Sequence, residues 1–533
     1  MTSLSEAIES WKKILGEQYV LTDPSKIAPY HNNVSALTRK APAVLRPNST
    51  QQVRDIVRVA NQFKTPLYPV GCGKNLGLGS QLPVRDGTSI VDLSRMNRIL
   101  EVNAEQHYAV VEPGVSQGQL YDHLLNNQIP LRLNVTGCGR EASVIGNVLE
   151  RGIGYFSTRA DSLSGMEVVL GNGEIIRTGF GHYPNCKTVH TYRYGIGPDL
   201  NGLFSQGNFG IVTSAGVDLM PKKGTHMTII ASLRREEDLS KFIDTLADLR
   251  RSGVIQAVVH VGNKHRTEIT LAPLVCAELE KNGINTDLRR KTLELLASEN
   301  FGPWSAIIGL FGPRRQMSAL RRETWQRLRP FARIVFLNDT LLNIASQLLD
   351  LAAFIPFFSR KRTILNAVKP LYGLSKGIPT DAAMNSLYWP VGERPPDKKF
   401  DADQTPCGML YCLPMMPLSG KVAKETMDAT DRISAKHGFN HCTTLNMLDH
   451  KTLEAVISLP FDRRNSGQTQ AAHRCLDETL RYYIDAGYPP YRVGIQSMSA
   501  VIDEKDSFWQ TVRSLKNAMD PNHIIAPGRY NLA

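Results

Sequence analysis

The stretch from Tyr68 to Ser80, YPVGCGKNLGLGS, constrains the fold most, because four of its residues are glycine, at 71, 73, 77 and 79. Glycines at this spacing allow positive φ and let successive N–H groups point at phosphate oxygens, so a diphosphate is the natural ligand. The loop fits neither G-x-x-x-x-G-K-[ST], since no Ser or Thr follows Lys74, nor G-x-G-x-x-G, since residue 76 is leucine. A simple structural turn is the alternative for a loop of this kind taken alone.

The segments around this loop predict an α/β opening. Residues 43–47 and 67–70 are typical of strands, and a helix between them begins after Ser49 with Gln52 at its third position. Residues 136–170 are again rich in glycine, which predicts a second wall of backbone over a flat ligand. GNGEII at 171–176 predicts a hairpin.

Composition bounds the remaining possibilities. A chain of 533 residues predicts two or three domains, and its net charge of +12 is spread out with few aromatics, which favours anionic small ligands over nucleic acid. The eight cysteines form no C-x-x-C pair and no zinc-finger spacing with histidine, so we expect reduced thiols, no metal site and a cytoplasmic protein. The N-terminus predicts a short amphipathic helix instead of a signal peptide.

Three further segments carry expectations. The apolar run 341–358 is interrupted by polar residues, so it predicts no membrane span; a helix buried in a domain or lining an entrance is favoured over one resting on an anionic membrane surface. The arginine-rich stretch 313–333 predicts a helix with a solvated face, with a docking patch for an acidic partner as the alternative. The loop 394–406 is expected to be exposed.

Several long motifs then appear in one order, and on them the chain resembles the vanillyl-alcohol oxidase and p-cresol methylhydroxylase (4-cresol dehydrogenase) flavoproteins along nearly its full length. They include PVGCGKNLGLGS, EPGV at 112–115, SVIGNVLERGIGY at 143–155, the glycine-rich run 194–221, PYRVG at 490–494 and DPNHIIAPGRYN at 520–531. The resemblance implies an α+β fold with a two-subdomain FAD-binding domain of the PCMH type. Residues 1–222 and 491–533 would form that domain, and residues 223–490 an α+β cap over the flavin ring.

The resemblance also implies which residues contact FAD. The diphosphate would lie on Gly71, Cys72, Gly73, Lys74, Asn75, Leu76, Gly77 and Leu78, and the ring system near Pro113, Gly114 and Val115. Gly137, Ser143, Gly146, Asn147 and Gly152 would form the facing wall. Ile211 and Val212 would lie beside the adenine, and Arg529 would reach back from the C-terminus.

Members of this family oxidise para-substituted phenols, held as phenolates by two tyrosines and an arginine. Tyr491 and Arg492 match one half of this clamp, but Leu78 stands where the second tyrosine belongs. Glu150 stands where the family has an aspartate near flavin N5, and is expected to act as base if burial tunes its pKa. The alternative for Tyr491 and Arg492 is a Tyr-Arg pair in a surface turn, and the alternative for Glu150 is a solvated glutamate at the end of a loop.

The family's other substrate contacts are also altered. Met409 occupies the position of the histidine that many members link covalently to the flavin, so we expect non-covalent FAD. An unusual covalent link through the nearby Tyr411 or Cys412 is the alternative. Leu453 and Glu454 replace a histidine pair, while His441 and His450 are weaker candidates nearby. The expected substrate contacts are therefore Leu78, Met409, Tyr411, Glu454, Tyr491 and Arg492.

The leading hypothesis is an FAD-dependent oxidoreductase that takes hydride from the benzylic or allylic carbon of a para-substituted phenol or aromatic alcohol. One alternative is oxidation of a non-phenolic alcohol or hydroxy acid, with Arg492 binding a carboxylate. Others are a flavoprotein subunit that docks a cytochrome-like carrier through 313–333, and a silent fold. Dioxygen and an electron-carrier protein both stay open as acceptor, and relatives are commonly dimeric or larger.

Overall fold

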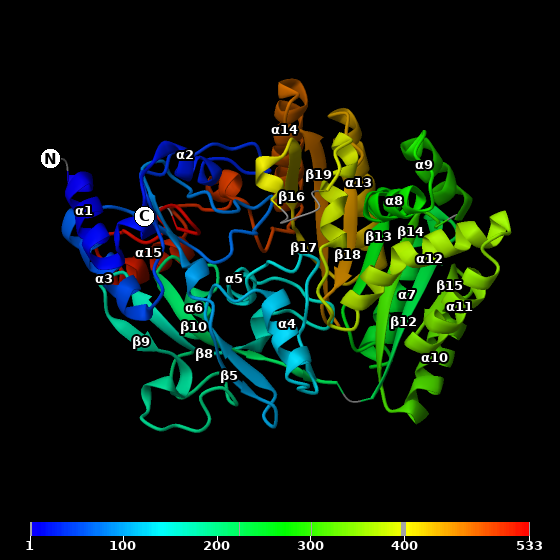
Figure 1. Cartoon of the computed structure of the whole chain (residues 1–533), viewed down its shortest axis with the longest axis horizontal. Coiled ribbons are helices and arrows are strands. Elements are labelled where there is room, and N and C mark those ends of the chain that lie inside the picture. Colours follow the sequence, from blue (N-terminus) through cyan, green and yellow to red (C-terminus); the bar gives the residue numbers. More distant parts are fainter. Residues whose placement is uncertain (1–2, 223, 300, 396–400, 532–533) are drawn as a thin grey trace.

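The computed structural model describes residues 3–222, 224–299, 301–395 and 401–531; the predicted loop 394–406 therefore lies partly outside the described residues. Figure 1 shows two ends of the molecule. The N-terminal elements and the C-terminal helix α15 (Ser507–Met519) share one end, and the green to orange segments form the other. The chain thus leaves its first part and returns to it.

A small four-stranded sheet carries the glycine loop. Its strand order is β1-β2-β4-β3, with β4 parallel to both β2 and β3. The strands are β1 (Val20–Leu21), β2 (Val44–Leu45), β4 (Ser89–Asp92) and β3 (Leu67–Val70). The loop leaves the carboxyl end of β3, the end at which ligands bind in open parallel sheets.

Helices cover this sheet as the sequence predicts. In α3 (Thr50–Phe63) the Ser49 side chain accepts from Gln52 N, and the apolar stripe from Val53 to Ala60 is buried. The predicted N-terminal helix is α1 (Ser3–Leu15), whose Trp11 Nε1 donates to Ile56 O at 3.2 Å. The cap at Ser49 and the amphipathic N-terminal helix are therefore confirmed.

A second sheet of five antiparallel strands follows, in the order β5-β6-β10-β8-β9. Its strands are β5 (Ile99–Asn103), β6 (Tyr108–Val111), β10 (Gly210–Asp218), β8 (Leu163–Leu170) and β9 (Ile175–Arg177). β8 and β9 pair antiparallel, which confirms the hairpin predicted at 171–176. Around it lie α4 (Gln117–Asn126), α5 (Val144–Leu149), α6 (Asn201–Phe204) and the pair β7 (Leu131–Arg132) and β11 (Met220–Pro221); the short α2 (Pro24–Ile27) precedes β2.

The C-terminal segment is fastened to β3. Leu67 N donates to Ile524 O at 2.7 Å, and Ala526 N donates to Leu67 O at 2.7 Å. Lys516 of α15 is fully buried in an ion pair with Asp520 at 2.6 Å. These contacts hold Arg529 close to the glycine loop.

The other end is an eight-stranded antiparallel sheet in the order β15-β12-β14-β13-β18-β19-β16, with β17 also paired to β19. Its strands are β15 (Ala332–Leu337), β12 (Thr225–Leu233), β14 (Trp304–Gly312), β13 (Val259–Asn263), β18 (Cys442–Met447), β19 (Thr452–Asp462), β16 (Cys407–Cys412) and β17 (Met415–Pro417). One face packs into a large core with α7 (Leu239–Arg251), α10 (Arg314–Leu328), α13 (Gly420–Lys436) and α14 (Ser466–Asp485). Helices α8 (Lys264–Lys281) and α9 (Leu288–Glu299) form a further cluster with α12 (Pro356–Leu374).

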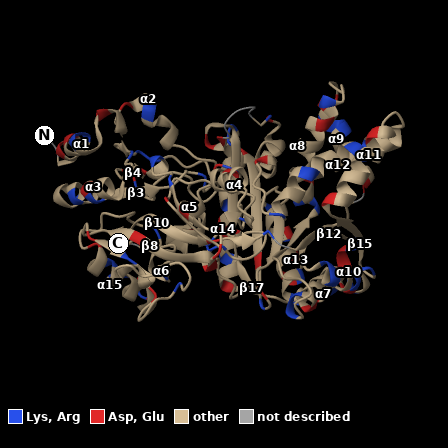
Figure 2. Cartoon of the chain, turned by 60° about the horizontal axis from the view of Figure 1, so that its bottom comes forward, with Lys and Arg blue, Asp and Glu red and all other residues tan. Residues whose placement is uncertain are grey.

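Helix α10 matches the expectation of a solvated basic face. Met317 and Leu328 are buried, while the arginines at 314, 315, 321 and 322 are exposed. Figure 2 shows the blue segments of α10 on the outside of the molecule.

The expectation that 341–358 is buried in a domain is wrong. This run spans α11 (Asp339–Leu351) and the start of α12, and its large apolar side chains face outward, with Leu351 79% and Phe354 83% exposed. It is neither buried nor part of the cavity described below, because α11 packs through other positions such as Leu342. Among the described residues, no helix is long and apolar enough to cross a bilayer.

Candidate active site

A cavity of about 540 Å³ is lined on one side by the glycine loop after β3 and by residues 136–150, and on the other by strands of the eight-stranded sheet. The predicted cofactor residues that line it are Gly71, Cys72, Gly73, Lys74, Asn75, Leu76, Leu78, Pro113, Gly137, Ser143, Gly146, Asn147, Ile211, Val212 and Arg529. The structure thus brings together segments from four distant parts of the sequence.

The glycine loop presents backbone donors to this cavity. Gly73 has φ +68°, which an L side chain rarely adopts. Among the described residues, no hydrogen-bond acceptor lies on the N–H groups of Gly73, Asn75, Leu76 and Gly77. Free amides on a glycine-rich turn fit the diphosphate of a dinucleotide.

The two glycine-rich segments are locked together behind the cavity. Ser143, at the start of α5, accepts from Gly146 N and donates from Oγ to Pro113 O at 2.6 Å. A Cβ on Gly114 would lie 2.7–2.8 Å from three carbonyl oxygens, so only glycine fits that approach. The structure therefore holds the 113–115 turn against the start of α5.

Four predicted cofactor residues do not line the cavity, namely Gly77, Gly114, Val115 and Gly152. Gly77 packs against the Tyr411 ring, Val115 is fully buried in a hydrophobic cluster, and Gly152 lies directly on the Asn147 side chain. Their Cα atoms pack behind the residues that line the cavity, and their contacts with a cofactor stay a prediction.

Glu150, which follows α5, lies between two arginines. Its Oε1 accepts from Arg529, and its Oε2 lies 3.4 Å from Arg492 Nε. Arg529 also donates to Tyr68 OH at 2.7 Å, and Arg492 donates to Asn75 in the glycine loop. The sequence positions 68, 75, 150, 492 and 529 therefore meet in one polar cluster.

This environment argues against Glu150 as a base. Burial by itself raises the pKa of the carboxyl, but the charges of Arg529 and Arg492 outweigh burial and leave the pKa below its ordinary value. A carboxylate with a lowered pKa accepts a proton poorly. The expectation that burial makes Glu150 a base is corrected by these two guanidinium groups.

A different carboxyl has the properties expected of a base. Glu454 on β19 lines the cavity, and burial raises its pKa to about 7 despite hydrogen bonds from Asn446 and Tyr491. Burial, followed by the charge of Glu454, holds the pKa of Tyr491 well above its ordinary value, so Tyr491 is a neutral phenol. The PYRVG segment is held in place by Tyr491 N donating to Leu413 O at 3.2 Å, just after β16.

Strand register connects Glu454 to a histidine that the sequence analysis did not single out. His260 on β13 is opposite Asn446 on β18, and Asn446 is opposite Glu454 on β19. His260 Nδ1 lies 2.7 Å from Asn446 Oδ1, and Asn446 Nδ2 donates to Glu454 Oε2 at 2.7 Å. Alternation in VHVGN hinted that His260 shares a face with Gly262, but only the pairing shows which neighbours it meets.

The remaining predicted substrate residues separate into two groups. Leu78 and Tyr411 line the cavity together with Glu454, Tyr491 and Arg492. Met409 does not: it lies on the same face of β16 as Tyr411, but it is fully buried in a small core with Val34 and Leu387, against which Tyr411 packs. The expected substrate contact of Met409 is thus not found, and Cys412 is likewise buried away from the cavity lining.

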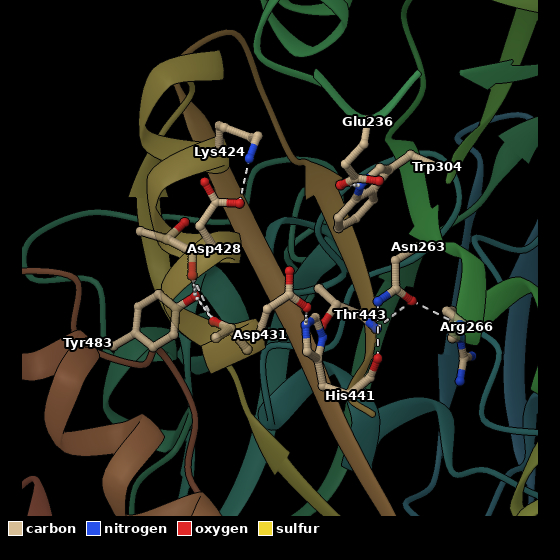
Figure 3. A network of polar contacts seen from close by, with 12 residues as sticks. Glu236, Asn263, Arg266, Trp304, Lys424, Asp428, Asp431, His441, Thr443 and Tyr483 are labelled. Carbon is tan, nitrogen blue, oxygen red and sulfur yellow. Dashed lines mark hydrogen bonds and ion pairs between the residues drawn. The ribbon is translucent and has the colours of Figure 1, made fainter. Parts of the chain in front are cut away.

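His441 and His450 also lie outside the cavity lining. His441 is buried, with Nε2 2.7 Å from Asp431 Oδ1 and Nδ1 2.6 Å from Thr443 Oγ1. Figure 3 shows this network beside Asn263, whose side chain accepts from Arg266 N and donates to His441 O. These contacts give His441 a structural role at the start of β18, and His450 is exposed.

Comparisons with known proteins agree with this geometry. Residues 41–179 match the family described as FAD binding domain. The chain is 32% identical to 1'-carboxy-chondrochloren decarboxylase of Chondromyces crocatus, and the match covers 99% of this chain and 97% of that protein. It is 28% identical to the 4-cresol dehydrogenase [hydroxylating] flavoprotein subunit of Pseudomonas putida, and that match covers 99% of this chain and 95% of that protein. It also resembles the solved structure of 4-ethylphenol oxidase from Gulosibacter chungangensis in complex with isoeugenol, with a TM-score of 0.84, 26% identity and coverage of 99% and 97%.

Proposed function

Because the chain belongs to the vanillyl-alcohol oxidase and 4-cresol dehydrogenase family of FAD-dependent oxidoreductases, we propose that it oxidises a para-substituted phenol at the carbon attached to the ring. The observation that carries this proposal is the contact of Tyr491 with both Arg492 and Glu454 at the cavity. Two similar proteins are named for 4-alkylphenols, which supports the same substrate class here.

In this proposal Arg492 and Tyr491 hold the phenol oxygen. The guanidinium of Arg492 stabilises the negative charge that develops on that oxygen, and it is already oriented by Glu150 and Asn75. Tyr491 passes the phenolic proton to the Glu454 carboxylate, whose pKa of about 7 suits a base near neutral pH. The phenol loses this proton from its oxygen and a hydride from the carbon attached to the ring at the para position. These two losses convert the substrate to a quinone methide.

In this proposal Glu150 acts through its negative charge on the two neighbouring arginines. Arg492 and Arg529 are both buried, and two unpaired guanidinium groups so close to each other would repel. The ionised Glu150 neutralises part of this charge and fixes the direction of both side chains. It is a positioning residue in this proposal.

FAD would be held by the glycine loop, the 137–147 wall and Arg529, and when bound it accepts the hydride. We propose that no covalent bond attaches it, because Met409 cannot form one and lies in the core. Residues 1–222 and 491–533 would carry the cofactor and residues 223–490 the cap. Acid precipitation tests the attachment: free flavin in the supernatant is expected, and flavin retained in the pellet would contradict the proposal.

The proposed substrate class is tested by anaerobic mixing of the purified holoenzyme with 4-alkylphenols, benzylic alcohols and aliphatic 2-hydroxy acids. We expect 4-alkylphenols to bleach the flavin absorbance fastest, and Arg492→Ala to slow this step by about 10²- to 10³-fold, because it removes a charge that stabilises the reacting oxygen. Arg513→Ala is the matched control, since Arg513 pairs with Glu504 on the surface. Fast bleaching by hydroxy acids alone, or an unchanged rate in Arg492→Ala, would overturn the assignment.

A second candidate is oxidation with loss of a carboxyl group, supported by the name of the 32% identical relative. Including 4-hydroxyphenyl carboxylic acids in the panel and measuring released CO₂ distinguishes the two reactions. Carbon dioxide formed in proportion to reduced flavin would favour this second candidate.

A further inference from the structure

One cationic side chain of the cavity has no counter-charge. Arg266 lines the cavity from the first turn of α8. Among the described residues, no carboxylate lies within ion-pair distance of its guanidinium and no group is hydrogen-bonded to it; the contacts of Arg266 are made by its backbone, with N–H donating to Asn263 Oδ1 at 2.9 Å and O accepting from Thr270 Oγ1 at 2.8 Å. Arg492 and Arg529, by contrast, both lie within ion-pair distance of Glu150.

The backbone explains why Arg266 faces the cavity. Asn263 ends β13 and caps α8, so the chain turns there and directs the first turn of the helix over the sheet. The Cγ of Arg266 would lie 3.5 Å from a Cβ on Gly262, so its stem rests on the glycine of the strand. Figure 3 shows the cap contact on the backbone of Arg266, with the guanidinium extended away from His441.

The neighbours of the guanidinium are polar but uncharged. Burial raises the pKa of Tyr155 to about 12, and the charge of Arg266 partly offsets that rise. Burial also raises the pKa of Tyr411, and Arg266 again lowers it in part. Burial, with a smaller contribution from Arg266, lowers the pKa of His260 to about 4, so this ring is neutral. None of these side chains supplies the negative charge that Arg266 lacks.

The same corner also holds an unused acceptor. Asn446 donates its amide to Glu454, so its Oδ1 faces His260 and accepts from Nδ1–H. His260 Nε2 is then a lone-pair acceptor, and it is buried without a hydrogen-bond partner among the described residues. Thr267, one residue after Arg266, also lines the cavity from the positive end of α8. Buried polar groups without a partner are uncommon in native structures. His260 Nε2 can accept from an O–H or N–H group of a ligand or water but not from a carboxylate anion, so Arg266 and Thr267 are the groups here that suit an anion.

We propose that Arg266 binds a carboxylate of the substrate, so that the cavity selects phenols whose para side chain carries an acid group. The guanidinium and the N-terminal turn of α8 would hold the carboxylate, while Arg492 and Tyr491 hold the phenol oxygen. Arg266 is a specificity-determining residue, and this inference rests on the proposed function for the phenol end.

Equilibrium binding to the oxidised holoenzyme tests the subsite. The ligands are 4-hydroxybenzoate, 4-hydroxyphenylacetate and 3-(4-hydroxyphenyl)propionate, each paired with its methyl ester, and the readout is calorimetric Kd. We expect at least one acid to bind about tenfold or more tightly than its ester. Arg266→Gln should remove this preference and Arg266→Lys should keep part of it, since lysine retains the charge and loses the bidentate geometry.

Lys264→Gln is the matched control, because Lys264 lies on the same turn, is exposed and does not line the cavity. It should leave the preference unchanged. An equal affinity for every acid and its ester, or an acid preference that survives in Arg266→Gln, would overturn the inference. If no phenol reduces the flavin but tighter binding of acids than of their esters depends on Arg266, the carboxylate subsite is supported and the proposed oxidation is wrong.

Discussion

The two walls of the cavity are built in opposite ways. The wall formed by the 71–78 loop and the start of α5 offers mostly backbone N–H groups, on turns that require glycine. The wall formed by β13, β18 and β19 offers side chains, namely His260, Asn446 and Glu454, arranged by cross-strand pairing. The first wall consists of two short runs of consecutive residues, whereas the second is made by single residues up to 194 positions apart, from 260 to 454.

This difference separates cofactor from substrate. A backbone wall tolerates few substitutions, because a side chain on it would fill the space that the ligand needs. A side-chain wall can change residue by residue while the strands stay paired, as Glu454 on β19 illustrates. The expected result is a family that keeps its cofactor and alters its substrate.

The largest effect is expected on the backbone wall. Gly73→Val places a β-branched side chain at φ +68° in the loop and should abolish FAD binding, so that the purified protein is colourless. Gly87→Val is the control, because Gly87 has φ +77° in open, exposed space away from the cavity. Both changes introduce backbone strain of roughly 1–2 kcal/mol. Loss of flavin in both variants alike would show that strain, and not the cradle, is responsible.

On the side-chain wall, Glu454→Gln should retain FAD and slow flavin reduction by about 10²- to 10⁴-fold, the usual loss when a general base is removed. In the wild type, the rate should rise with pH through about 7 as Glu454 loses its proton, and the variant should lack this rise. Stopped-flow reduction across pH measures both. If Glu454→Gln kept the pH dependence of the wild type, a group other than Glu454 would be the base.

Stability gives an independent check on Glu454. The native carboxyl binds its proton more tightly than the unfolded chain does, so this group lowers stability progressively as pH rises from 4.5 to about 7. Denaturant unfolding of Glu454→Gln should lack that decline. A parallel decline in both proteins would mean that Glu454 titrates normally.

A smaller effect is expected at Glu150, where the two walls meet. Glu150→Gln leaves two buried guanidinium groups without their anion and should lower the free energy of unfolding by about 3 kcal/mol at pH 7. Because the folded-state pKa of Glu150 is lowered, its contribution is present above 4.5 and is lost as pH falls through the folded-state value, so the deficit of the variant should shrink in acid. Glu504→Gln, at a surface pair with Arg513, should change stability by less than about 1 kcal/mol.

The sequence alone was sufficient for the family, the α+β fold and the glycine loop, because these depend on residues that are close together in the chain. Ser49, the hairpin at 171–176 and Gly73 each express a local backbone requirement. The outward face of 341–358 was not predictable in this way, since apolar content does not show which side of a helix meets the core.

Only the tertiary structure decided the chemistry of individual side chains. Glu150 looked like a base until Arg492 and Arg529 were seen on either side of it, and Glu454 became the better candidate through its burial beside Asn446 and Tyr491. Met409 is buried in a small core with Val34 and Leu387, and the cap at Asn263 begins the helix whose first turn brings Arg266 to the cavity. The pKa and reach of a side chain depend on charges and solvent within a few ångströms, and those neighbours come from parts of the chain that only folding brings together.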